Sequence, residues 1–465
     1  MRQNNQIKIR LNGELLGILL FHLIAFLLFS PCTFLPLSAQ NALTLQQLKD
    51  SALQHNIAIR NAQLNIEAAC QQRSEAFTKF FPNISGTGLT FNANKGMAKM
   101  EVNPGEVIPQ SWGEALATML PAEALASMAS PISISMMKNG TIGSLMAVQP
   151  IFAGGQIVNG NRLARIGEEA SRLQLSLSEN EVEKQTTYYY WQFISLQQKM
   201  HTIDAVDSLL SSIHKDVDMA VKAGVAMPND LLQIELRRND IESQRLKLKN
   251  ATGIVRMMLA HHCGLRDTSF AIDHSSFVHL ADELTIEQCD IQGLPEYQLL
   301  NKQVEAARLQ QKMEVGKNLP TVSVGAGYTY HNLMENNHNF GLLFATVNVP
   351  ISDWWGGMHA IKRRKIEYQK AQEQLADNTE LLKIRMQKAL NDVVEALGQL
   401  QIASRSVEQA SENLRISQNR YKAGTCTMSD LLQTHLLYQQ TLDQQTDCYC
   451  DYQNKLLEYH QATGQ

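Results

Sequence analysis

Two twelve-residue stretches of this 465-residue chain place a carboxylate at matching positions. KAGVAMPNDLLQ begins at Lys222 and carries Asp230, and KAGTCTMSDLLQ begins at Lys422 and carries Asp430. Carboxylates that several chains bring together on one axis repel one another, attract cations and disfavour anions. The sequence leaves a second interpretation open, in which each Asp only stabilises the start of a helix through the helix dipole. Lys222 and Lys422 can likewise be ordinary C-terminal helix charges or contacts with another protein.

The remaining residues that could do chemistry form no catalytic set. The sequence displays no Gly-rich phosphate loop, clustered metal ligands or Ser/His/Asp arrangement, so we predict no enzyme, no metal site and no cofactor. AHHCGL, from Ala260 to Leu265, is explained better by capping at a helix end than by zinc binding. Methionines between about Asn94 and Gly140 could bind Cu(I), but a lid that packs over the outer end of the molecule is the preferred interpretation. They are Met97, Met100, Met119, Met128, Met136 and Met137.

The elements that position the two carboxylates are two long helices. No proline lies between Gln156 and Ala223 or after Pro350, which predicts helices of about 65 residues, each roughly 100 Å long. Apolar positions in both follow a seven-residue repeat that is typical of coiled-coil packing. The positions are Ile203, Val206, Leu210, Ile213, Val217 and Ala220 in the first helix, and Leu400, Ala403, Val407, Ala410, Leu414 and Ser417 in the second.

Each long helix is predicted to end in a tight turn. Gly224 and Gly424 suit the residue after a helix end, where a left-handed backbone is common. A new helix follows at once, because Pro228 suits an opening turn and Thr427 with Asp430 resembles a capping box. The chain therefore forms two helical hairpins, with 200 residues between their tips.

Four strands are predicted at about 83–93, 141–151, 321–331 and 340–351, and shorter helices precede each pair at about 55–81 and 295–318. In the third strand Val322, Val324, Ala326, Tyr328 and Tyr330 share one face, and small or polar residues occupy the other. In the fourth, Leu343, Ala345, Val347, Val349 and Ile351 alternate with polar residues. This alternation fits a strand between lipid and a water-filled lumen, and it fits a half-buried sheet of a soluble protein equally well.

Two aromatic groups are assigned to packing or to an interface. TTYYYWQF, from Thr186 to Phe193, is interpreted as packing between helices rather than as a stacking site for a transported molecule. Trp354 and Trp355 follow the fourth strand and fit either an interfacial aromatic belt or a packed strand-to-helix corner.

Residues 1–39 are predicted to be a signal peptide, with basic residues before an apolar run and small residues before Gln40. Their removal takes away Arg2, Lys8, Arg10 and Glu14, so the formal charge of −4 becomes −6. A mildly acidic chain lacks the excess of positive charge that nucleic-acid binding requires. Residues 40–262 are a first structural repeat, 263–293 a connecting segment, and 294–465 a second repeat, with helical hairpins at about 156–262 and 358–463. Cys263 with Cys289 is the one disulfide pair we consider.

This organisation resembles the TolC-like outer membrane efflux proteins of Gram-negative bacteria over the whole mature chain. The resemblance is carried by LTLQQLKDSALQHN (43–56), the FPNIS and LPTVS strand entries, QPIFAGG, VPISDWWGG and NRYKAGTCTMSDLLQ. It implies a mainly α fold with a membrane β-barrel part: a duplicated helix–strand–strand–long helix–turn–helix. Four strands per chain would form a trimeric 12-stranded barrel, continued by a long α-helical coiled-coil tunnel in the periplasm.

The resemblance also implies roles for the tips. Asp430 matches the first residue of a family Asp-x-x-Asp pair whose second position is Gln433 here, and Asn229 with Asp230 aligns with a Thr-Asp pair. Tyr421 matches a family tyrosine whose arginine partner is replaced by Cys426. These six residues are the predicted periplasmic gate. The predicted adaptor contacts are Lys222, Ala223, Gly224, Lys422, Ala423 and Gly424.

The function implied is a passive exit duct in the outer membrane. A homotrimer would pass small molecules from an inner-membrane pump and a periplasmic adaptor to the exterior. Two alternatives stay open: the outer-membrane channel of a type I protein secretion system, and a soluble periplasmic coiled-coil scaffold.

Overall fold

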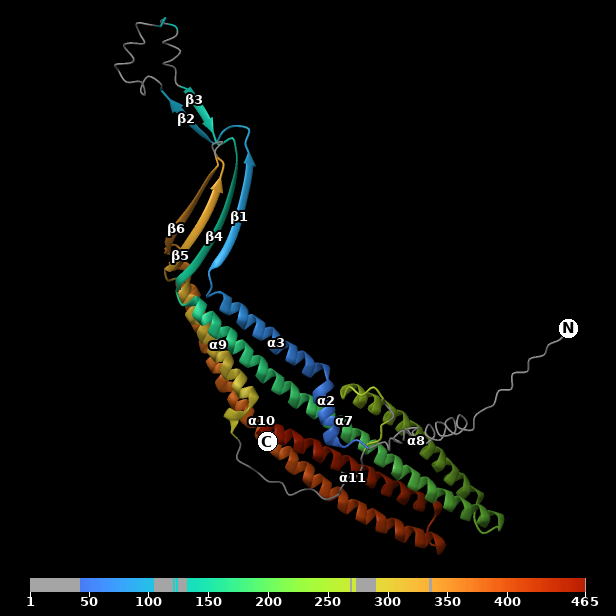
Figure 1. Ribbon diagram of the computed structural model, residues 1–465. Coiled ribbons are helices and arrows are strands. Elements are labelled where there is room, and N and C mark those ends of the chain that lie inside the picture. The colour runs from blue at the N-terminus through green and yellow to red at the C-terminus, as the bar shows by residue number, and fades with distance from the viewer. Residues whose placement is uncertain are drawn as a thin grey trace, which may run out of the picture.

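The computed structural model describes residues 42–103, 120–121, 123, 132–267, 270–272, 290–333 and 337–464. It is an elongated molecule with a sheet at one end and helices running away from it (Figure 1). Twice along the chain a helix is followed by strands, a long helix, a turn and a returning helix, with four strands in the first copy and two in the second. The elements are α2 (Leu45–His55), α3 (Ile57–Thr78), β1 (Asn83–Asn92), β2 (Ala98–Val102), β3 (Ile132–Met136), β4 (Asn139–Ala153), α7 (Gln156–Lys222), α8 (Pro228–His262), the 3-10 turn η1 (Ile291–Gly293), α9 (Pro295–Lys317), β5 (Thr321–His331), β6 (His338–Asn348), α10 (Asp353–Lys422) and α11 (Met428–Thr463).

The main sheet is antiparallel with the order β1-β4-β5-β6, so β1 and β6 are its edges. The four predicted strands are therefore present, and β5 has its predicted bounds. A second ribbon, β2–β3, lies beyond the end of the sheet that is remote from the helices (Figure 1). The sequence analysis did not predict this ribbon. The connection between its two strands, which carries Met119 and Met128, lies largely outside the described residues.

Two prolines at equivalent places have different effects on the strands. β6 ends at Asn348, so Val349 and Ile351 do not belong to the strand, contrary to the prediction. Pro350 accounts for this end because proline has no N–H to donate to a sheet and restricts the residue before it. β4 instead continues to Ala153 and shifts its register at Pro150, since a bulge can accommodate the missing donor.

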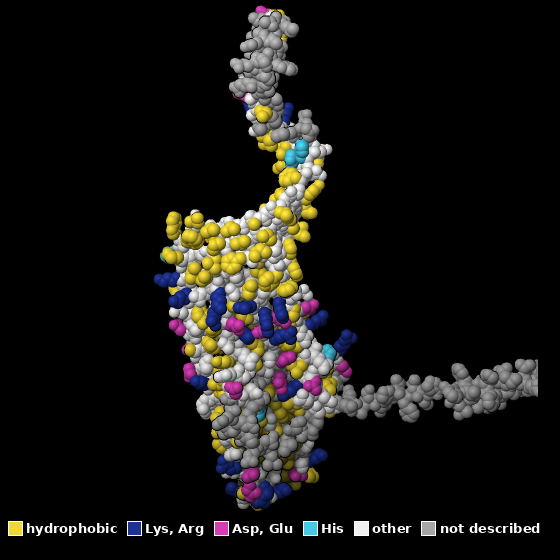
Figure 2. All heavy atoms as spheres, turned by 60° about the vertical axis from the view of Figure 1, so that its left-hand side comes forward, with side chains coloured by type: hydrophobic (Ala, Val, Ile, Leu, Met, Phe, Trp, Pro, Cys, Tyr) yellow, Lys and Arg dark blue, Asp and Glu magenta, His cyan; other side chains and the backbone are white. Residues whose placement is uncertain are grey.

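The sheet exposes apolar side chains. Leu343 is 87% exposed, Val347 66% and Ile84 67%. The strand register places Leu343 opposite Ala326 and Ala326 opposite Ala147, so the same face is apolar on three neighbouring strands. Figure 2 shows apolar side chains gathered in a band over this end of the molecule. Few contacts within the chain cover this band.

The helix predicted from about His55 to Phe81 is α3, and a separate helix that was not predicted, α2, precedes it. Asn56 ends α2 and begins α3 with an extended backbone, and its side-chain oxygen accepts a hydrogen bond from the Ala58 N–H at 2.8 Å. The Asn56 amide nitrogen also donates to the His262 carbonyl at 3.0 Å, which ties this break to the end of α8. This bond joins the boundary between the two helices to a residue 206 positions away.

The two long helices, α7 with 67 residues and α10 with 70, agree with the prediction. At 1.5 Å per residue each is about 100 Å long. Every position of the predicted seven-residue repeat is buried or half-buried. For example, Ile203 is 2% exposed, Leu210 0% and Leu400 3%. The repeat therefore marks the stripe with which each long helix packs on its neighbours.

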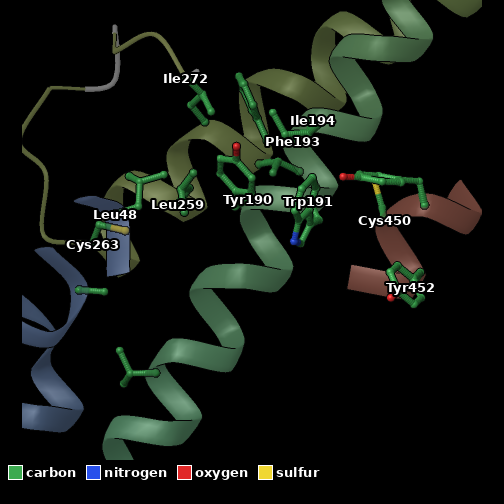
Figure 3. Packing of buried hydrophobic residues seen from close by; sticks show 14 of the residues in the cluster. Leu48, Tyr190, Trp191, Phe193, Ile194, Leu259, Cys263, Ile272, Cys450 and Tyr452 are labelled. Carbon is green, nitrogen blue, oxygen red and sulfur yellow. The ribbon is translucent and has the colours of Figure 1, made fainter. Parts of the chain in front are cut away.

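The largest cluster of buried side chains joins α2, α3, α7, α8, α10 and α11 (Figure 3). Tyr190, Trp191 and Phe193 from the aromatic run are at most 4% exposed, and the Trp191 ring makes edge contacts with Tyr190 and with Tyr449 of α11. The interpretation of this run as packing therefore holds for these three residues, whereas Tyr188 is 48% exposed in the single chain. Within the part of the chain that is described, no helix is both long and apolar enough to span a bilayer.

Candidate functional site

The tips of the two helical hairpins have the same backbone construction. Gly224 and Gly424 have φ of +76° and +69°, the left-handed region in which glycine is favoured. In the first tip the Gly224 N–H donates to Val221 and the Val225 N–H to Ala220, both at 2.9 Å. The second tip repeats both bonds 200 residues later. This pattern satisfies carbonyls at the helix end that would otherwise lack donors.

Asp230 and Asp430 have the same local role. The Asp230 carboxylate accepts a hydrogen bond from the Met227 N–H at 3.3 Å, and the Asp430 carboxylate accepts from the Thr427 N–H at 3.4 Å and the Thr427 hydroxyl at 2.6 Å. The bonds from Thr427 lower the pKa of Asp430, so this exposed carboxylate is ionised at neutral pH. The capping interpretation thus describes how both residues are held, and their role in a gate stays a prediction.

The two tips pack side by side on a shared apolar cluster. Its buried residues come from both hairpins: Val217, Ile234, Leu414, Met428 and Leu431. Tyr421 of α10 packs against this cluster, and its pKa is raised by burial and by the negative charge of Asp230 on α8. The fold therefore brings together Tyr421 and Asp230, which lie 191 positions apart in the sequence.

The other predicted gate residues surround this centre. Asn229 and Gln433 are exposed. Cys426 is half-buried, and its Sγ lies 4.0 Å from the Asp430 carboxylate, as a weak donor at most. A thiol here cannot replace the charge of the arginine that the family resemblance led us to expect.

The predicted contact residues are all on the surface but are not equivalent. Lys222 donates to Asp218 at 2.6 Å one turn earlier on α7. Lys422 has no ion pair among the described residues, and Ala223, Gly224, Ala423 and Gly424 are exposed. The first tip also exposes Val225 at 80% and Met227 at 71%. One tip thus presents apolar side chains and the other a free cation.

A buried polar group behind the tips was missed by the sequence analysis. His435 of α11 is 1% exposed, and its Nε2 has no hydrogen-bond partner among the residues that the structure describes. Burial and the nearby charge of Arg237 lower its pKa to about 4. Arg237 of α8 donates to Gln439 at 2.8 Å, and Gln439 donates to Gln244 of α8 at 2.9 Å. The seven-residue repeat of α11 could have indicated His435, since it follows Met428 and Leu431 at steps of three and four.

The AHHCGL segment is a helix end, as predicted. α8 ends at His262, Gly264 has φ +68°, and His262 Nε2 lies 3.2 Å from the Val182 carbonyl. Cys263 is buried with a free thiol, while Cys289 lies outside the described residues. Over the described ranges no group of three or more His, Cys, Asp or Glu side chains could hold a metal ion.

The fold is that of outer membrane channels. VceC, an outer membrane protein of Vibrio cholerae, aligns with a TM-score of 0.67 at 14% identity over 90% of this chain and 96% of its own. The Campylobacter jejuni outer membrane channel CmeC aligns with a TM-score of 0.70 at 14% identity over 90% and 85%. The open state of MtrE, an outer membrane channel of Neisseria gonorrhoeae, aligns with a TM-score of 0.65 at 15% identity over 90% and 88%.

Residues 295–465 match the family model described as outer membrane efflux protein. This match covers the second predicted repeat and agrees with the family resemblance seen in the sequence, and the similar structures are outer membrane proteins, in agreement with the predicted localisation. No protein with a curated description matches the sequence.

Proposed function

We propose that this chain is the outer-membrane exit duct of a tripartite efflux system, which passes small molecules outward from an inner-membrane pump and a periplasmic adaptor. The observation that carries the proposal is the sheet, which has two unpaired edges, β1 and β6, beside an exposed apolar face. In lipid an open edge leaves backbone groups without partners, so strands must close into a barrel. Four strands are too few for a barrel that spans a membrane.

Three copies remove both edges. β6 of one subunit pairs with β1 of the next, and the ring closes as a twelve-stranded barrel in the outer membrane. The apolar sheet face contacts lipid, and the helices of three chains continue below it as a coiled-coil tunnel. At about 100 Å, α7 and α10 carry the tips far into the periplasm.

The tips form the gate and the docking surface. Six tips in a trimer collect Asp230 and Asp430 in a ring, which attracts cations to the narrow end of the tunnel. Tyr421 beside Asp230 joins the two hairpins in the closed state. Val225, Met227 and Lys422 are the exposed groups that an adaptor contacts.

The domain division belongs to the same proposal. Residues 1–39 are the signal peptide, 40–262 and 294–465 are two repeats with similar tips, and 263–293 connect them. A trimer then offers six tips with the same backbone construction, in two kinds that differ in their exposed side chains, to a ring of adaptor chains.

The assembly is tested with the purified mature chain in detergent and in planar bilayers. We expect a mass of three chains by light scattering, and stepwise conductance after addition to a bilayer. A chain that is monomeric and leaves the membrane without detergent refutes the proposal and favours a soluble scaffold. Export of a protein rather than of small molecules by cells that carry the duct favours the secretion alternative.

The ring of carboxylates is tested with Asp230→Asn together with Asp430→Asn, because Asn retains an oxygen that can cap the helix. We expect a larger conductance and a weaker preference for cations. Asp377→Asn on α10 is a control that removes an exposed carboxylate 45 residues before the tip end of that helix. If the double variant keeps the conductance and the selectivity of the parent, the two residues do not line the gate.

A further inference from the structure

A row of Lys and Arg side chains lies directly below the apolar band of the sheet (Figure 2). The start of α10 contributes most to this charge. From Asp353 to Lys370 it has five basic residues and two acidic ones, although the whole chain has a formal charge of −4. Four of the five basic residues are consecutive, from Lys362 to Lys365. The excess of positive charge is therefore local to the end of the helix nearest the sheet.

One exposed face of α10 changes from apolar to cationic with distance from the sheet. Trp355 is 80% exposed and Met358 68%, and Lys362 lies seven residues after Trp355, about two turns further on the same face. Trp354 beside them donates from Nε1 to the Asn318 carbonyl at 3.0 Å, which fixes the helix start against the end of α9. Tryptophan prefers the boundary between hydrocarbon and headgroups.

Several of these cations have no acidic partner. Arg363 and Arg364 pair with Glu367 at 3.8 and 2.7 Å, but Lys362 and Lys365 are exposed and form no ion pair in the described part of the chain. Arg162 at the start of α7 and Lys312 near the end of α9 are exposed and unpaired in the same sense. A subunit interface over this face would bury these charges at a cost, whereas a layer of anionic groups would neutralise them.

The depth of the cations fits the headgroup layer. Lys362 is about 10 Å along the helix from Trp355, and the headgroup region is about 5–8 Å thick on each side of the hydrocarbon. Side chains of a helix tilt toward its N-terminus. On α7 and α10 this direction is toward the sheet, so the ammonium groups reach back toward the phosphates while their stems cover apolar surface.

We propose that the start of α10, with Trp355 and Met358 above Lys362 and Lys365, binds the headgroups of anionic phospholipids in the periplasmic leaflet. Arg162 and Lys312 extend this surface. The inference rests on the proposed insertion of the sheet in the outer membrane. It assigns to these residues the task of fixing the depth of the barrel in the bilayer.

The test uses the purified chain in phosphatidylcholine bilayers that contain a trace of spin-labelled lipid. Lipid in contact with the protein gives a motionally restricted signal, and the restricted fractions for phosphatidylglycerol and phosphatidylcholine give their relative affinity. We expect a preference for phosphatidylglycerol that falls at high salt. Lys362→Gln with Lys365→Gln should reduce the affinity at this site by about fivefold for each cation removed.

Lys247→Gln with Lys249→Gln is the matched control. Both residues are exposed lysines on α8, far from the sheet, and the change in charge is the same (Figure 1). Lys362→Arg with Lys365→Arg should retain the preference. A preference that is absent in the parent, or unchanged in the glutamine variant, overturns the inference. Absence of any restricted lipid signal would instead contradict insertion, and with it the proposed function.

Discussion

The charge state of His435 gives a prediction with a defined sign. The pKa of this buried imidazole is about 4 in the folded chain, compared with about 6.5 in an unfolded one. The opened state of the hairpin therefore binds more protons between these two values. Packing behind the tips is most stable above pH 6.5, and its stability falls as the pH drops from 6.5 toward 4.

The magnitude follows from the difference in pKa. Lowering the pH from 7 to 5 should reduce the stability of this part of the bundle by about 2 kcal/mol per chain through His435, or about thirtyfold in the local opening equilibrium. Asp443, two turns further along α11, acts in the opposite direction because burial raises its pKa to about 6. The net change in the parent is therefore smaller than the contribution of His435, and a variant must separate the two.

Hydrogen exchange of the α11 amides measures this local opening. We compare the parent with His435→Gln at pH 7 and at pH 5, so that the chemical exchange rate cancels between proteins at each pH. Protection near residue 435 should fall by about thirtyfold more in the parent than in the variant. Exposed His201 of α7 provides the control substitution, His201→Gln, which should leave the pH dependence unchanged. Equal pH dependence in the parent and in His435→Gln would refute the reasoning.

Three further predictions concern stability. Asp443→Asn should stabilise the bundle at pH 8 by roughly 1 kcal/mol, because the half-buried Asp443 carboxyl is destabilised when it is ionised, and solvent screens part of this cost. A melting temperature at pH 8 that is unchanged or lower than that of the parent contradicts this prediction. Gly224→Ala should cost about 1 kcal/mol because φ is +76°, with Gly253→Ala inside α8 as a control that should not destabilise; proteolysis of the tip measures the difference. Trp191→Ala should cost about 3–5 kcal/mol because it leaves a cavity among buried rings, and a melting temperature within a degree of the parent would show that this cluster is not tightly packed.

Periodic features of the fold could be predicted from the sequence. The first long helix begins at Gln156 and the second ends at Lys422, as the absence of proline and the seven-residue repeat indicate. Gly224 and Gly424 end them, and Thr427 with Asp430 forms the predicted capping box. Each depends on interactions within a few residues, so the local sequence carries the information.

Contacts between distant segments could not be predicted in this way. The hydrogen bond between Asn56 and His262 and the proximity of Tyr421 to Asp230 both depend on how distant helices pack. The residues of the candidate gate could therefore be named from the sequence, but their positions relative to one another could not.

The sequence by itself determined the two hairpins, their tips and the strands, because helix and strand periods and capping residues act over short distances. The tertiary structure decided that both tips share one apolar cluster, that His435 is buried without charge, and that an apolar sheet face stands above a row of cations. Burial and pKa depend on every neighbour in space, and those neighbours can come from parts of the chain more than two hundred residues apart.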